Sequence, residues 1–92
     1  MTTYFLIGTY GADAIKGISR KRTADATKMI EDIGGKLVSM YSLLGDKDLI
    51  IIAEFPGLKE AIKGSVSISK ITGISLTTYP AIIVEEFDEL MV

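Results

Sequence analysis

The chain has 92 residues, of which 48% are hydrophobic and 24% are charged, a composition typical of a globular protein and not of a disordered segment. Its formal net charge of −2 argues against nucleic acid or an anionic membrane as a partner, because both bind concentrated positive charge. The absence of cysteine and histidine excludes thiolate nucleophiles and the commonest transition-metal ligands. We therefore expect one domain over residues 1–92 with no cofactor and no metal.

The N-terminal residues lack the basic start and long apolar stretch of a signal peptide. No apolar run approaches the roughly 20 residues needed to cross a bilayer. We therefore expect a cytoplasmic protein with no membrane partner. A domain of this length buries only about 60–65% of its unfolded surface, so association with further copies would add stability.

The first third of the chain predicts a strand followed by a helix. Residues 3–10 are rich in aromatic and β-branched types and end at a glycine. From the candidate N-cap Ser19, apolar residues recur at helical spacing until Gly34-Gly35, which predicts a helix over 20–33. The segment between them, 12–18, is expected to form a turn that docks Ile15 and Ile18.

The middle of the chain predicts a β-hairpin. Strand-like runs at 36–44 and 49–55 flank the polar turn Gly45–Asp48, which would pair Leu44 with Leu49 and Tyr41 with Ile52. One face of this hairpin is expected to meet the helices, namely Val38, Met40, Leu44, Leu49, Ile51, Ala53 and Phe55. The opposite face would carry Leu37, Ser39, Tyr41, Leu43, Ile50, Ile52 and Glu54.

A second helix is predicted from Leu58 to a stop at Gly73, although Gly64 and the alternating serines around it also suit a strand. We prefer the helix because a parallel crossover must follow. Residues 74–79 predict the last strand, and the tail 81–92 predicts an extended piece with an acidic, partly helical end that docks on a neighbouring subunit or sheet edge. The apolar face of the second helix is expected to contain Leu58, Ala61, Ile62, Val66 and Ser69.

The order βαββαβ predicts an α+β, ferredoxin-like sandwich, in which a four-stranded antiparallel sheet carries both helices on one face. The other face would leave five large apolar side chains in water, although burial of each is worth roughly 1.5–3 kcal/mol. We therefore expect a second sheet to cover this face, which makes the protein at least a homodimer.

Several short motifs occur in a specific order along the chain: Arg22-Thr23, Gly34-Gly35-Lys36, Met40–Leu49, Pro56, Thr72–Ser75 with Thr78, Pro80-Ala81 and Val84–Asp88. In this order and spacing, the chain resembles the GYD-domain family over nearly its whole length. One position differs, because Lys47 in Gly45-Asp46-Lys47-Asp48 stands where the family has a tyrosine. The resemblance implies a dimeric α/β barrel, in which two ferredoxin-like sheets pack around a shared cavity, but it assigns no reaction.

Five residues are candidates for contact with a small molecule. Glu54, beside Tyr41 and opposite Ser39 on the uncovered face, could act as a base or ligand contact, or could reach solvent at the strand end. Arg22 could bind an anionic group or extend into water from the first helical turn. Tyr10, like Tyr41, would add an aromatic wall with a hydroxyl, although strand tyrosines commonly serve packing. The ligand is expected between the sheet and the start of the first helix.

The aspartates of the hairpin turn have a simpler interpretation than a metal site. Asp46 and Asp48 offer carboxylate oxygens, but the remaining ligands of a calcium loop are missing. A solvated turn in which aspartates accept backbone N–H bonds accounts for both residues.

We therefore expect a homo-oligomeric module that binds a small molecule or has a regulatory role. Two alternatives stay open. One is a cofactor-independent isomerase or monooxygenase that uses Tyr41, Glu54 or Arg22 in acid–base or oxyanion chemistry. The other is a pure assembly unit whose interface is filled by apolar side chains.

Overall fold

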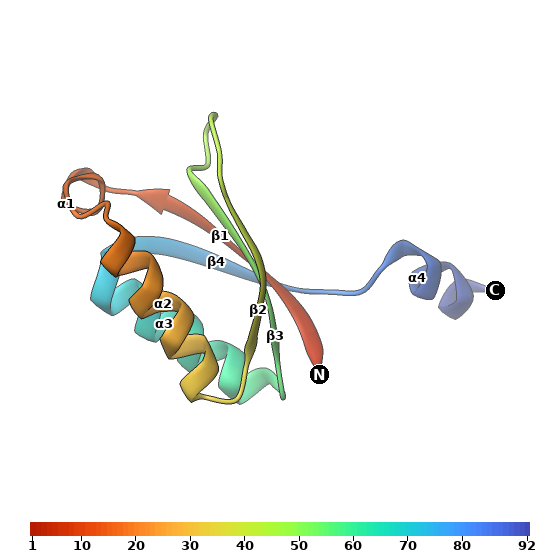
Figure 1. Cartoon of the computed structure of the whole chain (residues 1–92). Coiled ribbons are helices and arrows are strands. Elements are labelled where there is room, and N and C mark those ends of the chain that lie inside the picture. Colours follow the sequence, from red (N-terminus) through yellow and green to blue (C-terminus); the bar gives the residue numbers. More distant parts are fainter.

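One antiparallel sheet of four strands organises the chain, and the two long helices cover only one of its faces (Figure 1). The computed structural model describes all 92 residues. The strand order β2-β3-β1-β4 is that of the predicted α+β, ferredoxin-like fold. The elements are β1 (Thr2–Tyr10), α1 (Ala12–Lys16), α2 (Arg20–Asp32), β2 (Lys36–Ser42), β3 (Leu49–Phe55), α3 (Leu58–Thr72), β4 (Ile74–Ala81) and α4 (Val84–Met91).

The ends of α2 and α3 lie within one residue of the predicted positions because local side chains and glycines fix them. The Ser19 hydroxyl accepts the Arg22 backbone N–H at 3.0 Å, which satisfies a free donor of the first turn of α2. Gly34 after α2 and Gly73 after α3 have positive φ angles of 86° and 72°, which glycine adopts without strain. Both predicted helix stops are therefore confirmed.

The hairpin register differs from the prediction by two residues. Ser42 pairs with Leu49 and Tyr41 with Ile50, whereas Leu44 lies in the loop and is fully exposed. The loop is longer because the Leu43 backbone N–H donates to the carbonyl of Asp48 at 2.8 Å and closes the turn there. A slip of two residues keeps the alternation of faces, so β3 presents the predicted residues to the helices.

A bulge at Val38 changes the faces of β2. The register shifts between Leu37 and Ser39, so Val38 is an extra residue without a partner in β3. Leu37 lies opposite Ala53 and packs against the core, whereas Val38 is exposed. The predicted places of these two residues were therefore wrong, because one inserted residue reverses the faces on its far side.

The core lies between the sheet and the helices. Its largest fully buried side chains are Phe55, Leu6, Ile30, Ile51 and Ile68. The ring of Phe55 meets that of Tyr4 edge-on, with centroids 5.8 Å apart. A Cβ atom at Gly64 would lie 3.0 Å from Phe55 ring carbons, so the glycine lets α3 approach the sheet closely. This contact explains a glycine inside a helix, where it costs about 1 kcal/mol relative to alanine.

Two predicted apolar faces are oriented differently in the structure. In α3 the buried residues are Ala61, Gly64, Ile68 and Thr72, so Leu58, Ile62 and Val66 form a stripe that is more than half exposed. In α1 only Ala14 is buried, whereas Ile15 and, after the helix, Ile18 are exposed. In both helices a small residue, Gly64 or Ala14, is among those that face the core.

The C-terminal helix α4 projects from the sheet on the side opposite α2 and α3 (Figure 1). None of its residues is buried. The tail has the predicted helical end, whereas its extended part is short: Ala81 ends β4, Ile82 and Ile83 follow, and α4 begins at Val84. None of the helices is long and apolar enough to cross a membrane.

Candidate functional site

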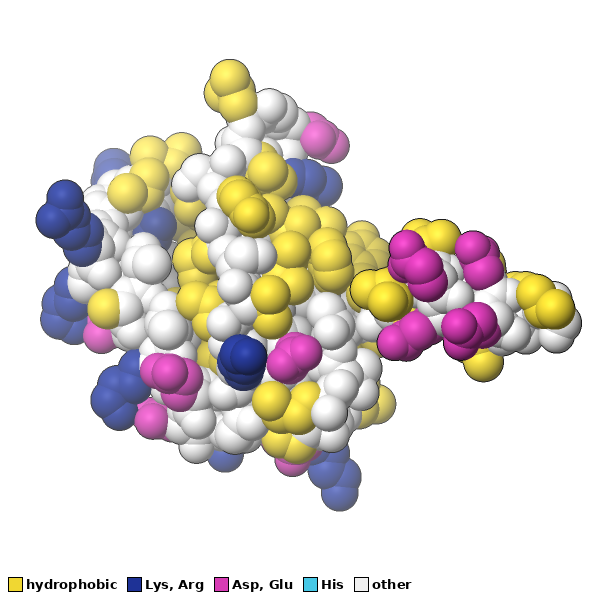
Figure 2. All heavy atoms as spheres, turned by 45° about the vertical axis from the view of Figure 1, so that its right-hand side comes forward, with side chains coloured by type: hydrophobic (Ala, Val, Ile, Leu, Met, Phe, Trp, Pro, Cys, Tyr) yellow, Lys and Arg dark blue, Asp and Glu magenta, His cyan; other side chains and the backbone are white.

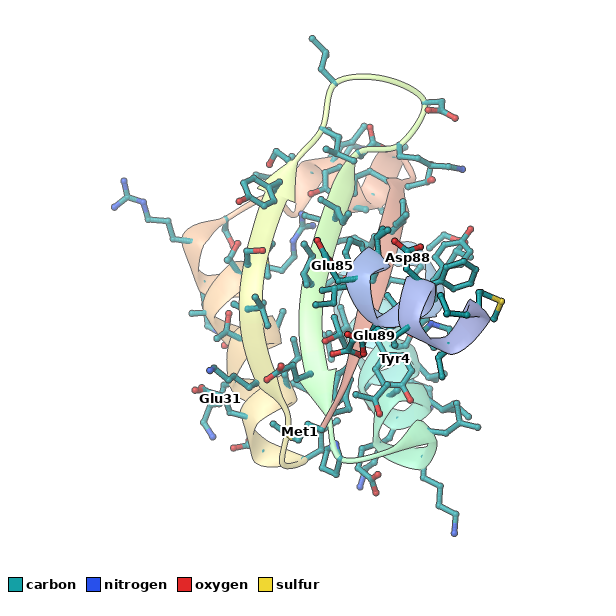
Figure 3. All side chains as sticks on the ribbon, turned by 90° about the vertical axis from the view of Figure 1, so that its right-hand side faces the viewer. Met1, Tyr4, Glu31, Glu85, Asp88 and Glu89 are labelled. Atoms are coloured by element: carbon teal, nitrogen blue, oxygen red, sulfur yellow. The ribbon has the colours of Figure 1, made fainter.

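The face of the sheet that no helix covers, here called the open face, is the main uncovered surface of the fold. Hydrophobic side chains gather across it in Figure 2, and Figure 3 views it directly, with α4 standing in front of the sheet. Its centre is built by cross-strand neighbours on β1 and β3: Phe5 lies opposite Ile52, and Ile7 lies opposite Ile50. All four side chains are half-buried in the single chain.

Hydroxyl groups border this apolar centre on both sides. On β2, Tyr41 pairs with Ile50 and Ser39 pairs with Ile52. On β4, Tyr79 pairs with Phe5 and Thr77 pairs with Ile7. The open face can therefore contact an apolar body along its middle and offer O–H donors and acceptors at its edges.

Glu54 is the carboxylate of the open face, and it lies toward one end. It pairs with Thr3 on one side and Lys36 on the other, not with Ser39 as predicted. The two-residue register slip moves Ser39 opposite Ile52, and the bulge at Val38 then brings Lys36 opposite Glu54. Tyr41 pairs with Ile50, four residues before Glu54 along β3. At about 3.3 Å per residue, Tyr41 and Glu54 are separated by roughly 13 Å along the strands.

The other two predicted site residues, Tyr10 and Arg22, come together on the helix-covered side of the sheet. The Arg22 guanidinium lies 5.5 Å from the Tyr10 ring centroid in a cation–π contact and donates to the backbone carbonyl of Ala14. Both line a cavity of about 40 Å³ with core residues of α2, β3 and β4. Arg22 is therefore partly buried in the single chain, and it joins α1 to α2 and the end of β1.

The five candidate residues thus form two groups on opposite sides of the sheet. Ser39, Tyr41 and Glu54 belong to the open face, whereas Tyr10 and Arg22 belong to the helix side. One chain does not bring Arg22, Tyr41 and Glu54 around a common space, because the sheet separates them. A ligand contact by any of these residues stays a prediction.

The hairpin loop is tied to the end of β1 through Asp48. Its carboxylate accepts the Tyr10 backbone N–H at 2.8 Å, and its own N–H donates to the carbonyl of Gly8 at 2.9 Å. Asp48 is therefore a structural turn residue that accepts a backbone N–H, as predicted. Asp46, two residues earlier, is exposed.

The family profile described as GYD domain matches residues 4–91, which is nearly the whole chain and includes this loop. The chain belongs to the GYD-domain family. No curated protein sequence matches it. Within the Gly45–Asp48 motif of this GYD domain, Asp48 has a structural role. Lys47, in the position of the family tyrosine, is exposed.

We expect Asp48→Ala to lower the free energy of unfolding of this GYD domain by about 1–2 kcal/mol, because the partly buried Tyr10 N–H loses a charged acceptor. Urea denaturation monitored by circular dichroism measures this change. Asp46→Ala is the matched control in the same loop, and its expected effect is below about 0.5 kcal/mol. Equal effects of the two substitutions would contradict the assigned role of Asp48.

Sequence reasoning missed Phe5 and Ile7 as centres of the open face of this GYD domain. In β1 nearly every residue from Tyr4 to Ile7 is large and apolar, so no alternation indicates which residues face the helices. The available signal was the pairing of β1 with β3, whose Ile50 and Ile52 were already assigned to the uncovered face.

Proposed function

We propose that this GYD domain is a homo-oligomeric module with a small-molecule-binding or regulatory role. In this proposal, the open faces of two copies pack together and enclose the ligand. The observation that supports it best is the apolar centre formed by Phe5, Ile7, Ile50 and Ile52, which no helix covers. Burial of such side chains is worth up to roughly 1.5–3 kcal/mol each, so the face gains substantially when it is covered.

The spacing between packed sheets suits this arrangement. Two sheets pack face to face at about 10 Å, a distance filled by the side chains of both inner faces. Where small side chains such as Ser39 and Thr77 oppose each other, space remains for a bound molecule. The space would lie between the same residues of both copies, because a two-fold interface repeats every contact.

The chemistry of the face indicates the class of ligand. An apolar centre bordered by the hydroxyls of Tyr41, Tyr79, Ser39 and Thr77 fits a largely apolar, uncharged molecule with a few carbonyl or hydroxyl groups. Glu54 would accept a hydrogen bond from a donor group at one end of that molecule. An anionic ligand is disfavoured at the centre of the face, because Arg22 lies on the other side of the sheet and Lys36 lies at one end, opposite Glu54.

The geometry favours binding over acid–base catalysis. An isomerase or monooxygenase that uses Tyr41 and Glu54 together would need both within hydrogen-bond reach of one reacting group. Within one chain they are separated by roughly 13 Å along the strands. We therefore place enzymatic activity second to ligand binding.

Native mass spectrometry of freshly purified protein tests the proposal, since it reports stoichiometry and any retained molecule together. We expect a dimer or a larger even-numbered assembly that carries one small molecule for each pair of open faces. Tyr41→Phe and Glu54→Gln should reduce ligand retention by several-fold and leave the stoichiometry unchanged, because each removes one hydrogen-bonding group. Asp46→Asn, in the loop outside the open face, is the control for both.

Two results would count against the proposal. A folded wild-type monomer at micromolar concentration would contradict the pairing of open faces. An assembly that carries no molecule, and whose melting temperature does not respond to a panel of neutral apolar compounds, would identify a pure assembly unit.

A further inference from the structure

Two apolar surfaces outside the open face are left without a partner in the single chain. The first is a groove between α3 and β4, here called the α3–β4 groove, with a volume of about 190 Å³. Its lining includes Leu58, Ile62 and Val66 from α3 and Thr78 and Pro80 from β4. The three α3 residues are 65%, 54% and 51% exposed, so the helix presents a continuous apolar stripe at i, i+4 and i+8.

The second surface is one side of α4. Val84, Phe87, Leu90 and Met91 share this side at helical spacing, and each is at least half exposed. The other side of α4 is acidic, as Figure 2 shows, and carries Glu85, Glu86, Asp88 and Glu89. A surface helix of this pattern normally buries its apolar side against another element.

The two surfaces agree in length. The α3 stripe extends over nine residues from Leu58 to Val66, a rise of about 12 Å over eight steps of 1.5 Å. Helix α4 has eight residues and is therefore nearly as long. An apolar stripe of one can cover the apolar stripe of the other from end to end.

They also agree in charge. Lys59 and Lys63 each follow a groove residue by one position, so they lie about 100° further around α3. Lys59 is the nearer of the two to the groove, whereas Lys63 lies toward α2 and lines a hollow there with Asp25 and Asp32. Both are exposed, and neither is in a salt bridge. With its apolar side in the groove, α4 would place carboxylates on the side of Lys59, which favours docking with the apolar side inward over docking with the acidic side inward.

The direction of the chain points to a groove on another molecule. The sheet lies between α3 and α4, because α3 packs on the covered face and α4 stands in front of the open face (Figures 1 and 3). Only Ile82 and Ile83 link β4 to α4, and Ile83 is extended with φ −68° and ψ 151°. Two extended residues span at most about 7 Å and continue here away from α3.

From these observations, we propose that α4 of one copy docks in the α3–β4 groove of a second copy. The contact exchanges identical elements between protomers, so each exchange buries both unpartnered surfaces. It uses none of the residues of the open face. A chain that uses the open face for one neighbour and α4 for another forms an assembly larger than a dimer.

Disulfide crosslinking tests the contact directly, because the native chain has no cysteine. Ile62→Cys and Phe87→Cys are made as separate full-length variants at exposed positions, mixed, and oxidised mildly. We expect a crosslinked species of twice the chain mass that forms about tenfold faster than in the control mixture, because docking raises the local concentration of the two thiols. The control mixture pairs Phe87→Cys with Ile15→Cys, an exposed isoleucine of α1 that lies outside the groove.

Three variants extend this test. Lys59→Glu and Lys63→Glu introduced together into the Ile62→Cys chain should slow the crosslink several-fold. Ile50→Cys mixed with Phe87→Cys should behave like the control, because Ile50 is on the open face. Addition of Ile52→Asp to both crosslinking partners should leave the crosslink in place, which separates this contact from the pairing of open faces.

Four results would overturn the proposal. The first is a mixture of Ile62→Cys and Phe87→Cys that reacts no faster than the control. The second is preferential reaction of Phe87→Cys with itself, which would show that two α4 helices pair with each other. The third is preferential reaction with Ile50→Cys, which would place α4 on the open face. The fourth is a chain carrying both substitutions that crosslinks only within itself at every protein concentration, which would place α4 in its own groove.

Discussion

Ile52→Asp is expected to convert the proposed assembly into folded monomers or smaller assemblies. In one chain, Ile52 is half-buried at the centre of the open face, opposite Phe5. A carboxylate there stays hydrated in the monomer, but it would be enclosed without a partner when two open faces pack together. The expected cost of burying it is several kcal/mol, because an isolated charge loses its hydration.

At about 1.4 kcal/mol for each factor of ten, a penalty of 3–5 kcal/mol raises the dissociation constant by roughly 100-fold or more. Sedimentation velocity over a range of micromolar concentrations measures this shift, and far-UV circular dichroism confirms that the monomer is folded. Ile15→Asp makes the same chemical change at an exposed position of α1 and should leave the assembly intact. An unchanged sedimentation coefficient for Ile52→Asp would show that the open face is not the interface.

The sequence was sufficient to predict the elements because their ends are determined locally. Ser19 caps α2 with its own side chain, and Gly73 ends α3 with a backbone conformation that other residues avoid. In β3 successive side chains point to opposite faces, so the polar Glu54 places Ile52 toward the open face and Ile51 toward the helices. These features depend on residues a few positions apart, so a single sequence contains them.

The predictions were wrong where contacts between distant segments determine the strand register or the buried face of a helix. The loop register depends on Asp48, whose carboxylate bonds to the Tyr10 N–H on another strand. The bulge at Val38 leaves no sequence signal, because Leu37 and Val38 are both apolar and either could face the core. In α3 two apolar stripes overlap, and the close approach of Gly64 to Phe55 selects the one with smaller residues.

The candidate site was only partly predictable for the same reason. Tyr41 and Glu54 were assigned to the open face because strand alternation is local, and this assignment is confirmed. Their separation along the sheet and the position of Arg22 behind it depend on register and on helix packing. Sequence spacing could therefore select the residues but could not determine which of them lie together.

Alanine substitutions of two phenylalanines, one on each face of the sheet, are expected to change the free energy of unfolding in different ways. Phe55 is fully buried on the helix side, between the Tyr4 ring and α3 at Gly64. Phe5 is half-buried on the open face of the neighbouring strand. The two side chains are chemically identical, so a difference between their alanine variants reports only the surroundings.

Phe55→Ala should lower the free energy of unfolding by about 3–5 kcal/mol at every protein concentration, since it leaves a cavity in the core of each chain. This is a large part of the roughly 5–14 kcal/mol expected for a domain of this length, so the variant should be marginally folded. Phe5→Ala should cost little in the dilute, dissociated protein. Its effect should grow with protein concentration, because in the proposed assembly Phe5 contacts a second copy and stability then depends on association.

Urea denaturation at several protein concentrations distinguishes these cases. The difference between wild type and Phe55→Ala should stay constant across the series, whereas that between wild type and Phe5→Ala should widen as the wild-type midpoint rises. If Phe5→Ala were as costly as Phe55→Ala at the lowest concentration, the open face would already be covered within one chain. The physical reason for expecting a second copy there would then be lost, because the apolar centre of the face would have found its partner locally.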